Sequence, residues 1–116
     1  MKKNQDLFIL TSNILNKIRK IIKKEKPNIV FVHGDTTTAF VTALACFYEN
    51  IKLAHIEAGL RTYNLNSPFP EEFNRQVISK IASYHFAPTI HFILSIISIA
   101  GSLYHKYFFY YFFCYF

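Results

Sequence analysis

Three acidic residues lie in motifs with the residue types of an acid–base site. Asp35 follows the apolar run 28–32 in the string His-Gly-Asp-Thr-Thr-Thr, and Glu57 follows the run 52–56 in His-Ile-Glu-Ala-Gly-Leu-Arg-Thr. Glu71 follows a loop with two prolines and opens a helical pattern. Ligands of open α/β sheets bind at the carboxyl ends of the strands, so we expect the three carboxylates to converge on one crevice. Carboxylates in one crevice can divide acid and base duties when burial separates their pKa values.

Asp35 and Glu57 also have purely structural explanations. Aspartate is among the best helix N-caps, and either Asp35 or a neighbouring threonine can cap the helix that follows. A glutamate at a strand end is unfavourable to bury without a partner, and Arg61 is the candidate structural partner for Glu57. The residues alone leave both explanations open.

Glu71 and Glu72 open the third predicted helix, where negative charge suits the helix dipole. Arg75 lies four residues after the first and three after the second, which predicts a surface ion pair. His33 and His55 each end a predicted strand, where a lone histidine is more often hydrogen-bonded in the core than catalytic. The histidines lack a ligand pattern such as HExxH, so we expect neither a metal nor a cofactor.

Alternating patterns along the chain predict the elements that position these motifs. Helical periodicity at 5–25 is followed by a β-branched apolar run at 28–32, and Pro27 separates the two. The remaining expected elements are a helix at 36–48, a strand at 52–56, a loop at 58–69, a helix at 71–82 and a strand at 84–87. This order predicts an α/β fold with a parallel sheet and right-handed crossovers.

The composition changes abruptly near residue 89. From Tyr107 to Phe116 every residue except Cys114 is aromatic, and residues 90–116 contain no acidic residue and no clear helical or strand period. Three interpretations compete: a membrane segment, a buried strand pair, or out-of-frame translation of an A/T-rich gene. The abrupt shift favours the last, and it predicts a division into residues 1–89 and an unrelated tail at 90–116.

Length and charge limit the classes of function. The 116 residues make one domain at most, and most of the net charge of +6 comes from Lys17, Arg19, Lys20, Lys23, Lys24 and Lys26. Apolar periodicity beneath those lysines favours a solvated helix face over a nucleic-acid interface, so we expect no nucleic-acid partner. The two cysteines have no CxxC or metal spacing, and no secretory signal is visible, so we expect a cytoplasmic protein.

The motifs, taken as whole strings, resemble the non-hydrolysing UDP-N-acetylglucosamine 2-epimerases. The matching stretch runs from about residue 26 to residue 89, with its most specific strings at 32–38, 47–48, 55–62, 67–72, 74–75 and 84–89. The resemblance implies a Rossmann-like parallel sheet that forms part of the N-terminal half of a GT-B two-domain fold. It also implies a cleft that holds the nucleotide-sugar UDP-GlcNAc, no cofactor, and the option of a homodimer for the intact enzyme.

The resemblance further implies the chemistry of the three carboxylates. Members of the family interconvert UDP-GlcNAc and UDP-ManNAc by eliminating UDP across C1–C2 and adding it back with inversion at C2. The acid/base residues of the family fall on Asp35, Glu57 and Glu71, and the first two are also expected to contact the nucleotide-sugar. The residues do not indicate which carboxylate removes the proton from which epimer.

Several parts that the family pattern would include are missing from this sequence. The first strand with its basic residues would precede Met1, and a catalytic histidine and the UDP-gripping domain would follow residue 89. We therefore expect a fragment that is inactive alone, because half a cleft cannot position the substrate. The alternative is a non-enzymatic α/β domain that residues 90–116 tether to a membrane.

Overall fold

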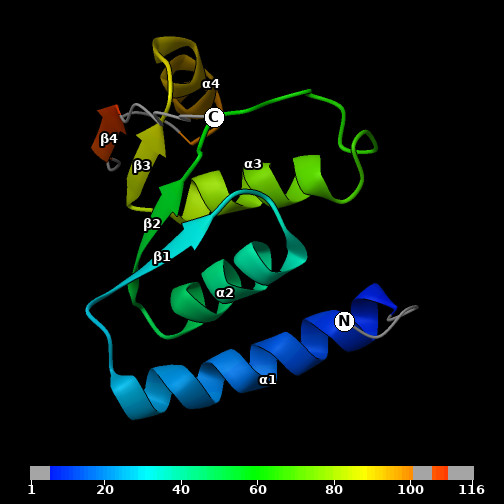
Figure 1. Ribbon diagram of the computed structural model, residues 1–116, viewed down its shortest axis with the longest axis vertical. Coiled ribbons are helices and arrows are strands. Elements are labelled where there is room, and N and C mark those ends of the chain that lie inside the picture. The colour runs from blue at the N-terminus through cyan, green and yellow to red at the C-terminus, as the bar shows by residue number, and fades with distance from the viewer. Residues whose placement is uncertain (1–5, 101–105, 110–116) are drawn as a thin grey trace, which may run out of the picture.

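The computed structural model describes residues 6–100 and 106–109, and it shows helices packed on one parallel sheet (Figure 1). The elements in chain order are α1 (Leu7–Glu25), β1 (Ile29–His33), α2 (Thr37–Tyr48), β2 (Lys52–Ile56), α3 (Glu71–Ile81), β3 (Tyr84–Ala87), α4 (Ile90–Ala100) and β4 (Lys106–Phe109). Each element up to β3 lies within one or two residues of the range that the sequence predicts.

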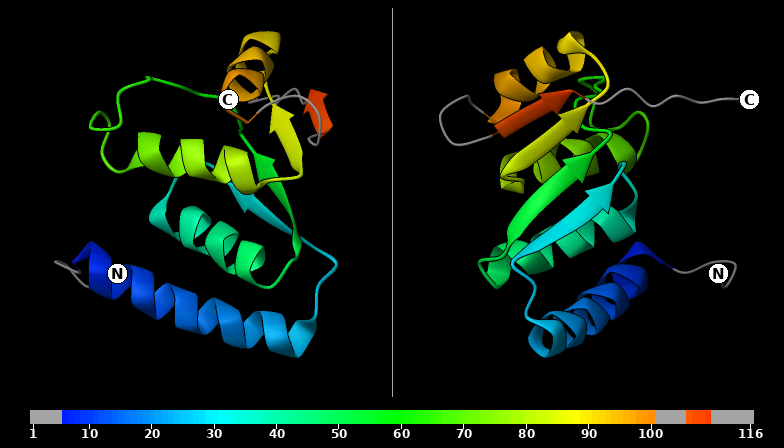
Figure 2. Two further views of the ribbon diagram at one scale, coloured as in Figure 1. Left: turned by 180° about the vertical axis from the view of Figure 1, so that it is seen from behind. Right: turned by 60° about the vertical axis from the view of Figure 1, so that its left-hand side comes forward.

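The sheet has the order β1-β2-β3-β4, and all of its pairs are parallel (Figure 2). Val32 pairs with His55, and His55 pairs with His85, so the strands end at one common edge. Apolar, β-branched runs are typical of parallel strands, because helices cover them. The predicted α/β fold with a parallel sheet is confirmed.

The main core lies between the sheet, α2 and α3. Val32 and Leu53 from the strands contact small residues of α2 and Ile78 of α3. The alanines of α2 allow this helix to approach the sheet closely, and Thr36 caps it by accepting the backbone N–H of Ala39 at 3.2 Å. The threonine, and not Asp35, is therefore the N-cap, which leaves the Asp35 carboxylate available for other contacts.

Helix α1 packs mainly on α2 and carries a cluster of basic residues, Lys17, Arg19, Lys20, Lys23 and Lys24. Leu15, Ile18 and Ile22 contact the main core, whereas most of the other side chains of α1 are exposed. The helix lies on the outside of α2 (Figure 1). This arrangement agrees with the predicted solvated basic face.

Regular structure continues beyond residue 89, where the sequence shows no clear period. Ile93 and Ile96 of α4 are buried together with Ala58 and Ala87, and Tyr107 of β4 packs against the same cluster. The spacing of three residues places the two isoleucines on one face of α4. Few polar residues mark the opposite face, so the helical period is hard to detect in the sequence. Within residues 6–100 and 106–109, no helix has the length and apolar character needed to cross a bilayer. The expectations for 101–105 and 110–116 lie outside the described residues.

Candidate active site

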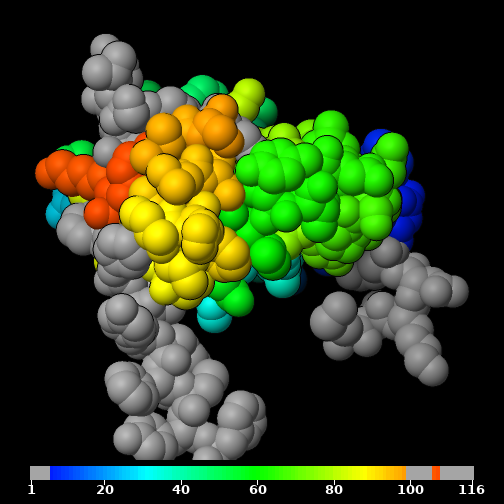
Figure 3. Space-filling view, turned by 90° about the horizontal axis from the view of Figure 1, so that it is seen from above, coloured from blue at the N-terminus to red at the C-terminus, as the bar shows by residue number. Residues whose placement is uncertain are grey.

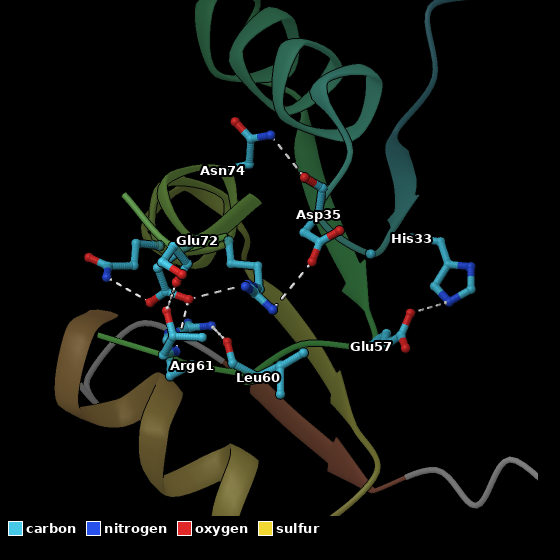
Figure 4. Close-up of polar contacts among 12 residues, drawn as sticks. His33, Asp35, Glu57, Leu60, Arg61, Glu72 and Asn74 are labelled. Carbon is cyan, nitrogen blue, oxygen red and sulfur yellow. Dashed lines mark hydrogen bonds and ion pairs between the residues drawn. The ribbon is translucent and has the colours of Figure 1, made fainter. Parts of the chain in front are cut away.

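Asp35 and Glu57 follow neighbouring strands at the same edge of the sheet. Asp35 comes two residues after β1, and Glu57 comes one residue after β2. The backbone N–H of Gly34 donates to the carbonyl of Ile56 at 3.0 Å, which extends the pairing of the two strands to this point. The expectation that both carboxylates lie at one edge agrees with the structure. The two side chains nevertheless point to different partners (Figure 4).

Glu57 pairs with His33 from the adjacent strand. The Oε2 atom of Glu57 lies 3.0 Å from Nε2 of His33, and both side chains are more than half exposed. Glu57 has a φ of 64°, and its carboxylate lies so close to β1 that a Cβ atom on Gly34 would be 3.7 Å from Oε2. This local turn directs the carboxylate toward β1 and toward solvent.

Two sequence-based expectations about these residues are wrong. Arg61 does not pair with Glu57; it donates to the carbonyl of Leu60 and to the hydroxyl of Ser79 on α3. His33 is not a core residue, because alternation along β1 buries Val32 and leaves the next side chain exposed. His55 does follow the expectation, since it is buried and its Nε2 lies 2.8 Å from the carbonyl oxygen of Gly34.

Asp35 is held by the first turns of α3. Its Oδ2 atom lies 3.3 Å from Nη1 of Arg75, and its backbone carbonyl accepts a hydrogen bond of 2.9 Å from Nδ2 of Asn74. The Asp35 side chain is 30% exposed, so one side of the carboxylate remains accessible. The helix after the long loop therefore folds back over the edge that carries Asp35.

Glu72 is the buried carboxylate next to Arg75 in α3. Its Oε2 accepts the N–H of Thr62 at 3.0 Å and lies 3.3 Å from Nε of Arg75, while Oε1 accepts from Tyr63 at 3.2 Å and Gln76 at 2.9 Å. The predicted surface ion pair is wrong in its location, because Glu72 is 0% exposed and Arg75 is 4% exposed. Closure of the loop 57–70 over α3 buries the pair.

The surroundings of Glu72 favour its ionised form. Burial by itself raises the pKa of this carboxyl, but the hydrogen bonds from Gln76, Thr62 and Tyr63 and the charge of Arg75 outweigh it and lower the pKa. A carboxylate that is ionised and surrounded by donors accepts hydrogen bonds but does not supply a proton. Glu72 is thus suited to holding other groups and not to acid catalysis.

Glu71 differs from Glu72 in its burial and in its contacts. It is the first residue of α3 and is half-buried. Within the described ranges 6–100 and 106–109, its carboxylate takes part in no hydrogen bond or ion pair. Of the three predicted site residues, Glu71 is therefore the one whose carboxylate is not engaged.

The sequence interpretation missed Glu72, Asn74 and Arg75 as parts of the site. A signal was present, because Glu72, Arg75 and Ser79 recur at spacings of three and four and so share one face of α3 with the fully buried Ile78. Polar residues on the buried face of a helix indicate a buried network rather than a surface pair. Among the described residues, no group of three or more His, Cys, Asp and Glu side chains could hold a metal ion.

Burial of His55 makes the fold sensitive to mild acid. Desolvation lowers the pKa of His55 to about 4; the hydrogen bond with Gly34 opposes this shift, and the charges of Arg61 and His33 add to it. The unfolded chain takes up a proton near pH 6.5 and the native chain does not, so stability is complete above pH 6.5 and declines as pH falls toward 4. We expect the free energy of unfolding to decrease by about 3 kcal/mol across this window because of His55.

Urea denaturation at pH 7.0 and pH 4.5 checks this expectation. His55→Asn should flatten the pH dependence, whereas the exposed control His91→Asn should retain it. A His55 ring that titrates above pH 6 by NMR would contradict the proposed cause.

Comparisons with known proteins identify relatives of this chain. A family model for UDP-N-acetylglucosamine 2-epimerase matches residues 1–98. The UDP-N-acetylglucosamine 2-epimerase of Campylobacter jejuni is 59% identical over 90 residues, which are 78% of this chain and 24% of that protein. The Bacillus subtilis enzyme of the same name is 56% identical over 89 residues, or 77% of this chain and 23% of that protein. The chain thus spans about a quarter of the length of these relatives.

Solved structures show the same likeness in three dimensions. The UDP-GlcNAc 2-epimerase of Neisseria meningitidis, bound to UDP-GlcNAc, superimposes with a TM-score of 0.86 and 46% identity over 93% of this chain and 29% of that chain. The Methanocaldococcus jannaschii enzyme, in complex with UDP-GlcNAc and UDP, gives a TM-score of 0.83 and 38% identity over 90% of this chain and 28% of that chain. The four-stranded parallel α/β unit matches part of these GT-B-like enzymes, and the chain belongs to the UDP-N-acetylglucosamine 2-epimerase family.

Proposed function

We propose that this chain carries one part of a UDP-GlcNAc 2-epimerase site, with Asp35, Glu57 and Glu71 as its acid/base carboxylates. Asp35 and Glu57 also contact the nucleotide-sugar in this proposal. The observation that carries it is the common edge: two carboxylates follow adjacent parallel strands, and the helix that Glu71 opens is tied to the same edge through Asn74. This edge is where open α/β sheets bind ligands.

The environments of the three carboxylates suit different roles in the reaction. Asp35 is partly buried beside a guanidinium group, Glu57 is exposed beside an imidazole, and Glu71 is not engaged with another side chain. Epimerisation at C2 requires proton removal on one face of the sugar and proton delivery on the other. Groups in distinct environments can divide these two tasks.

We further propose that the 116-residue chain does not turn over UDP-GlcNAc by itself. Elimination and re-addition of UDP demand that the detached nucleotide is held in position, and a single edge of one sheet provides few contacts for it. The UDP-binding contacts of the intact enzymes would then come from segments outside this chain.

NMR of the purified chain with UDP-GlcNAc tests both proposals. We expect no UDP-ManNAc signal after prolonged incubation, while the amide signals of residues 34–36, 57–59 and 71–72 shift on titration. Asp35→Asn and Glu57→Gln should weaken these shifts, and the exposed, remote control Glu49→Gln should not. Turnover that Asp35→Asn abolishes would show that the chain is catalytically sufficient, and an absence of shifts would refute binding at this edge.

The division of the chain at residue 89 stays a prediction. The family model extends to residue 98, so it includes most of α4. The DNA that flanks the reading frame tests the out-of-frame interpretation of residues 90–116. Family-like sequence in another frame, directly downstream of the codon for Thr89, is the expected result if that interpretation is correct.

A further inference from the structure

The carboxylate of Glu72 joins helix α3 to the loop that follows β2. Thr62 and Tyr63 belong to the loop that begins at Glu57, whereas Gln76 and Arg75 belong to α3; all four donate to, or pair with, the same two oxygens. Because Glu72 is fully buried, no water can replace a lost partner easily. The position of the loop backbone thus depends on this carboxylate.

Arg75 extends this connection to Asp35. Its Nε atom faces Glu72 and its Nη1 atom faces Asp35, with both N–O distances at 3.3 Å. The guanidinium group is planar and rigid, so a partner that fixes one edge of it also fixes the direction of the other edge. Figure 4 labels Glu72 and Asp35 and marks the hydrogen bonds and ion pairs among the residues drawn as dashed lines.

We infer that Glu72 is a positioning residue for the proposed epimerase site, which orients Asp35 through Arg75 and fixes the loop that follows Glu57. The inference rests on the proposed function for the importance of those two carboxylates, but the coupling is a property of the free chain. Three hydrogen bonds and the ion pair with Arg75 engage both oxygens of the buried Glu72, so its carboxylate is not presented to a substrate. Glu72 therefore acts through Asp35 and the loop, and not on the sugar.

Glutamine at position 72 is the sharpest test of this role. It has the same shape as glutamate, but only one of its two terminal atoms accepts hydrogen bonds. In either orientation its NH₂ group would face two donors, either Thr62 with Arg75 or Tyr63 with Gln76. The loop and Arg75 must then move relative to each other.

The experiment is NMR of the ligand-free 116-residue chain at pH 7, for wild type, Glu72→Gln and Ile78→Val. In Glu72→Gln we expect shifted amide signals for Thr62 and Tyr63 and a shifted side-chain carboxyl carbon signal for Asp35. Ile78→Val, which loosens the buried face of the same helix without altering the polar network, should leave these three signals in place. In a second arm, we expect UDP-GlcNAc to bind Glu72→Gln about tenfold more weakly than wild type.

An unchanged Asp35 signal in folded Glu72→Gln would overturn the coupling. If that variant does not fold, Gln76→Ala removes one half-buried donor and keeps the carboxylate; smaller shifts at both Tyr63 and Asp35 are expected, and a change at neither would overturn the inference. If the wild-type chain shows no response to UDP-GlcNAc, the proposed function fails, while the signals of the ligand-free chain still decide the coupling.

Discussion

Replacing Arg75 with methionine is expected to lower the free energy of unfolding by about 3–5 kcal/mol at pH 7. The side chain is 4% exposed and lies between Asp35 and the fully buried Glu72. Methionine fills much of the volume but removes the ion-pair partner, so the buried anion of Glu72 keeps only the more distant positive charge of Arg61. Breaking a buried pair in this way is far more damaging than losing a surface pair. Urea denaturation followed by circular dichroism measures the change.

The pH dependence of this difference separates charge from packing. Glu72 has a lowered pKa in the wild type, so its stabilisation is present above the pKa of an unfolded glutamate, near 4.3, and is lost as pH falls through the lower native value. The difference in the free energy of unfolding between wild type and Arg75→Met should therefore become smaller as Glu72 becomes protonated. Lys80→Met is the matched control, because Lys80 is exposed on the same helix, and its effect should stay within about 0.5 kcal/mol. A loss of less than about 1 kcal/mol in the free energy of unfolding of Arg75→Met at pH 7 would contradict the buried-pair interpretation.

The same pair illustrates what the sequence could predict about the site. Strand runs and turn motifs placed Asp35 and Glu57 at one edge, because parallel strands dictate which ends meet. The partners of these residues depended on the path of the loop 57–70, which has no periodic pattern to reveal where it closes. Arg75 therefore looked like a surface residue, although the loop buries it, and Arg61 bonds to Ser79 instead of Glu57.

The elements beyond residue 89 were hidden for a different reason. Helix α4 consists almost wholly of apolar residues and serines, so the usual contrast between a buried face and a charged face is weak. In the structure the distinction comes from the neighbours: Ile93 and Ile96 face Ala58 and Ala87, while Leu94 stays exposed. Tertiary contacts, and not local pattern, decide which residues of α4 are buried.

Gly59 lies in the loop after β2, directly against helix α4, so a side chain at this position is expected to displace that helix. A Cβ atom built on Gly59 would lie less than 2.5 Å from the carbonyl oxygen of Phe92 and 2.6 Å from its Cβ. The loop and α4 are pressed together at this point, and Figure 3 shows the loop residues, in green, directly beside α4, in yellow and orange. Gly59 also has a φ of 100°, which residues with a side chain rarely adopt.

Gly59→Ala is therefore expected to destabilise the chain by about 3 kcal/mol or more, because backbone strain and displacement of α4 add together. Gly34→Ala is the matched control: Gly34 has a φ of 72°, but the nearest atom to its added Cβ would be Glu57 Oε2 at 3.7 Å. Gly34→Ala has the same backbone strain but no steric overlap with a neighbouring residue, so a loss of about 1–2 kcal/mol in the free energy of unfolding is expected. Urea denaturation gives both values, and amide hydrogen exchange in α4 identifies the cause: protection of residues 92–97 should fall in Gly59→Ala and persist in Gly34→Ala. Equal losses of stability in the two variants, with α4 protected in both, would show that α4 does not rest on Gly59.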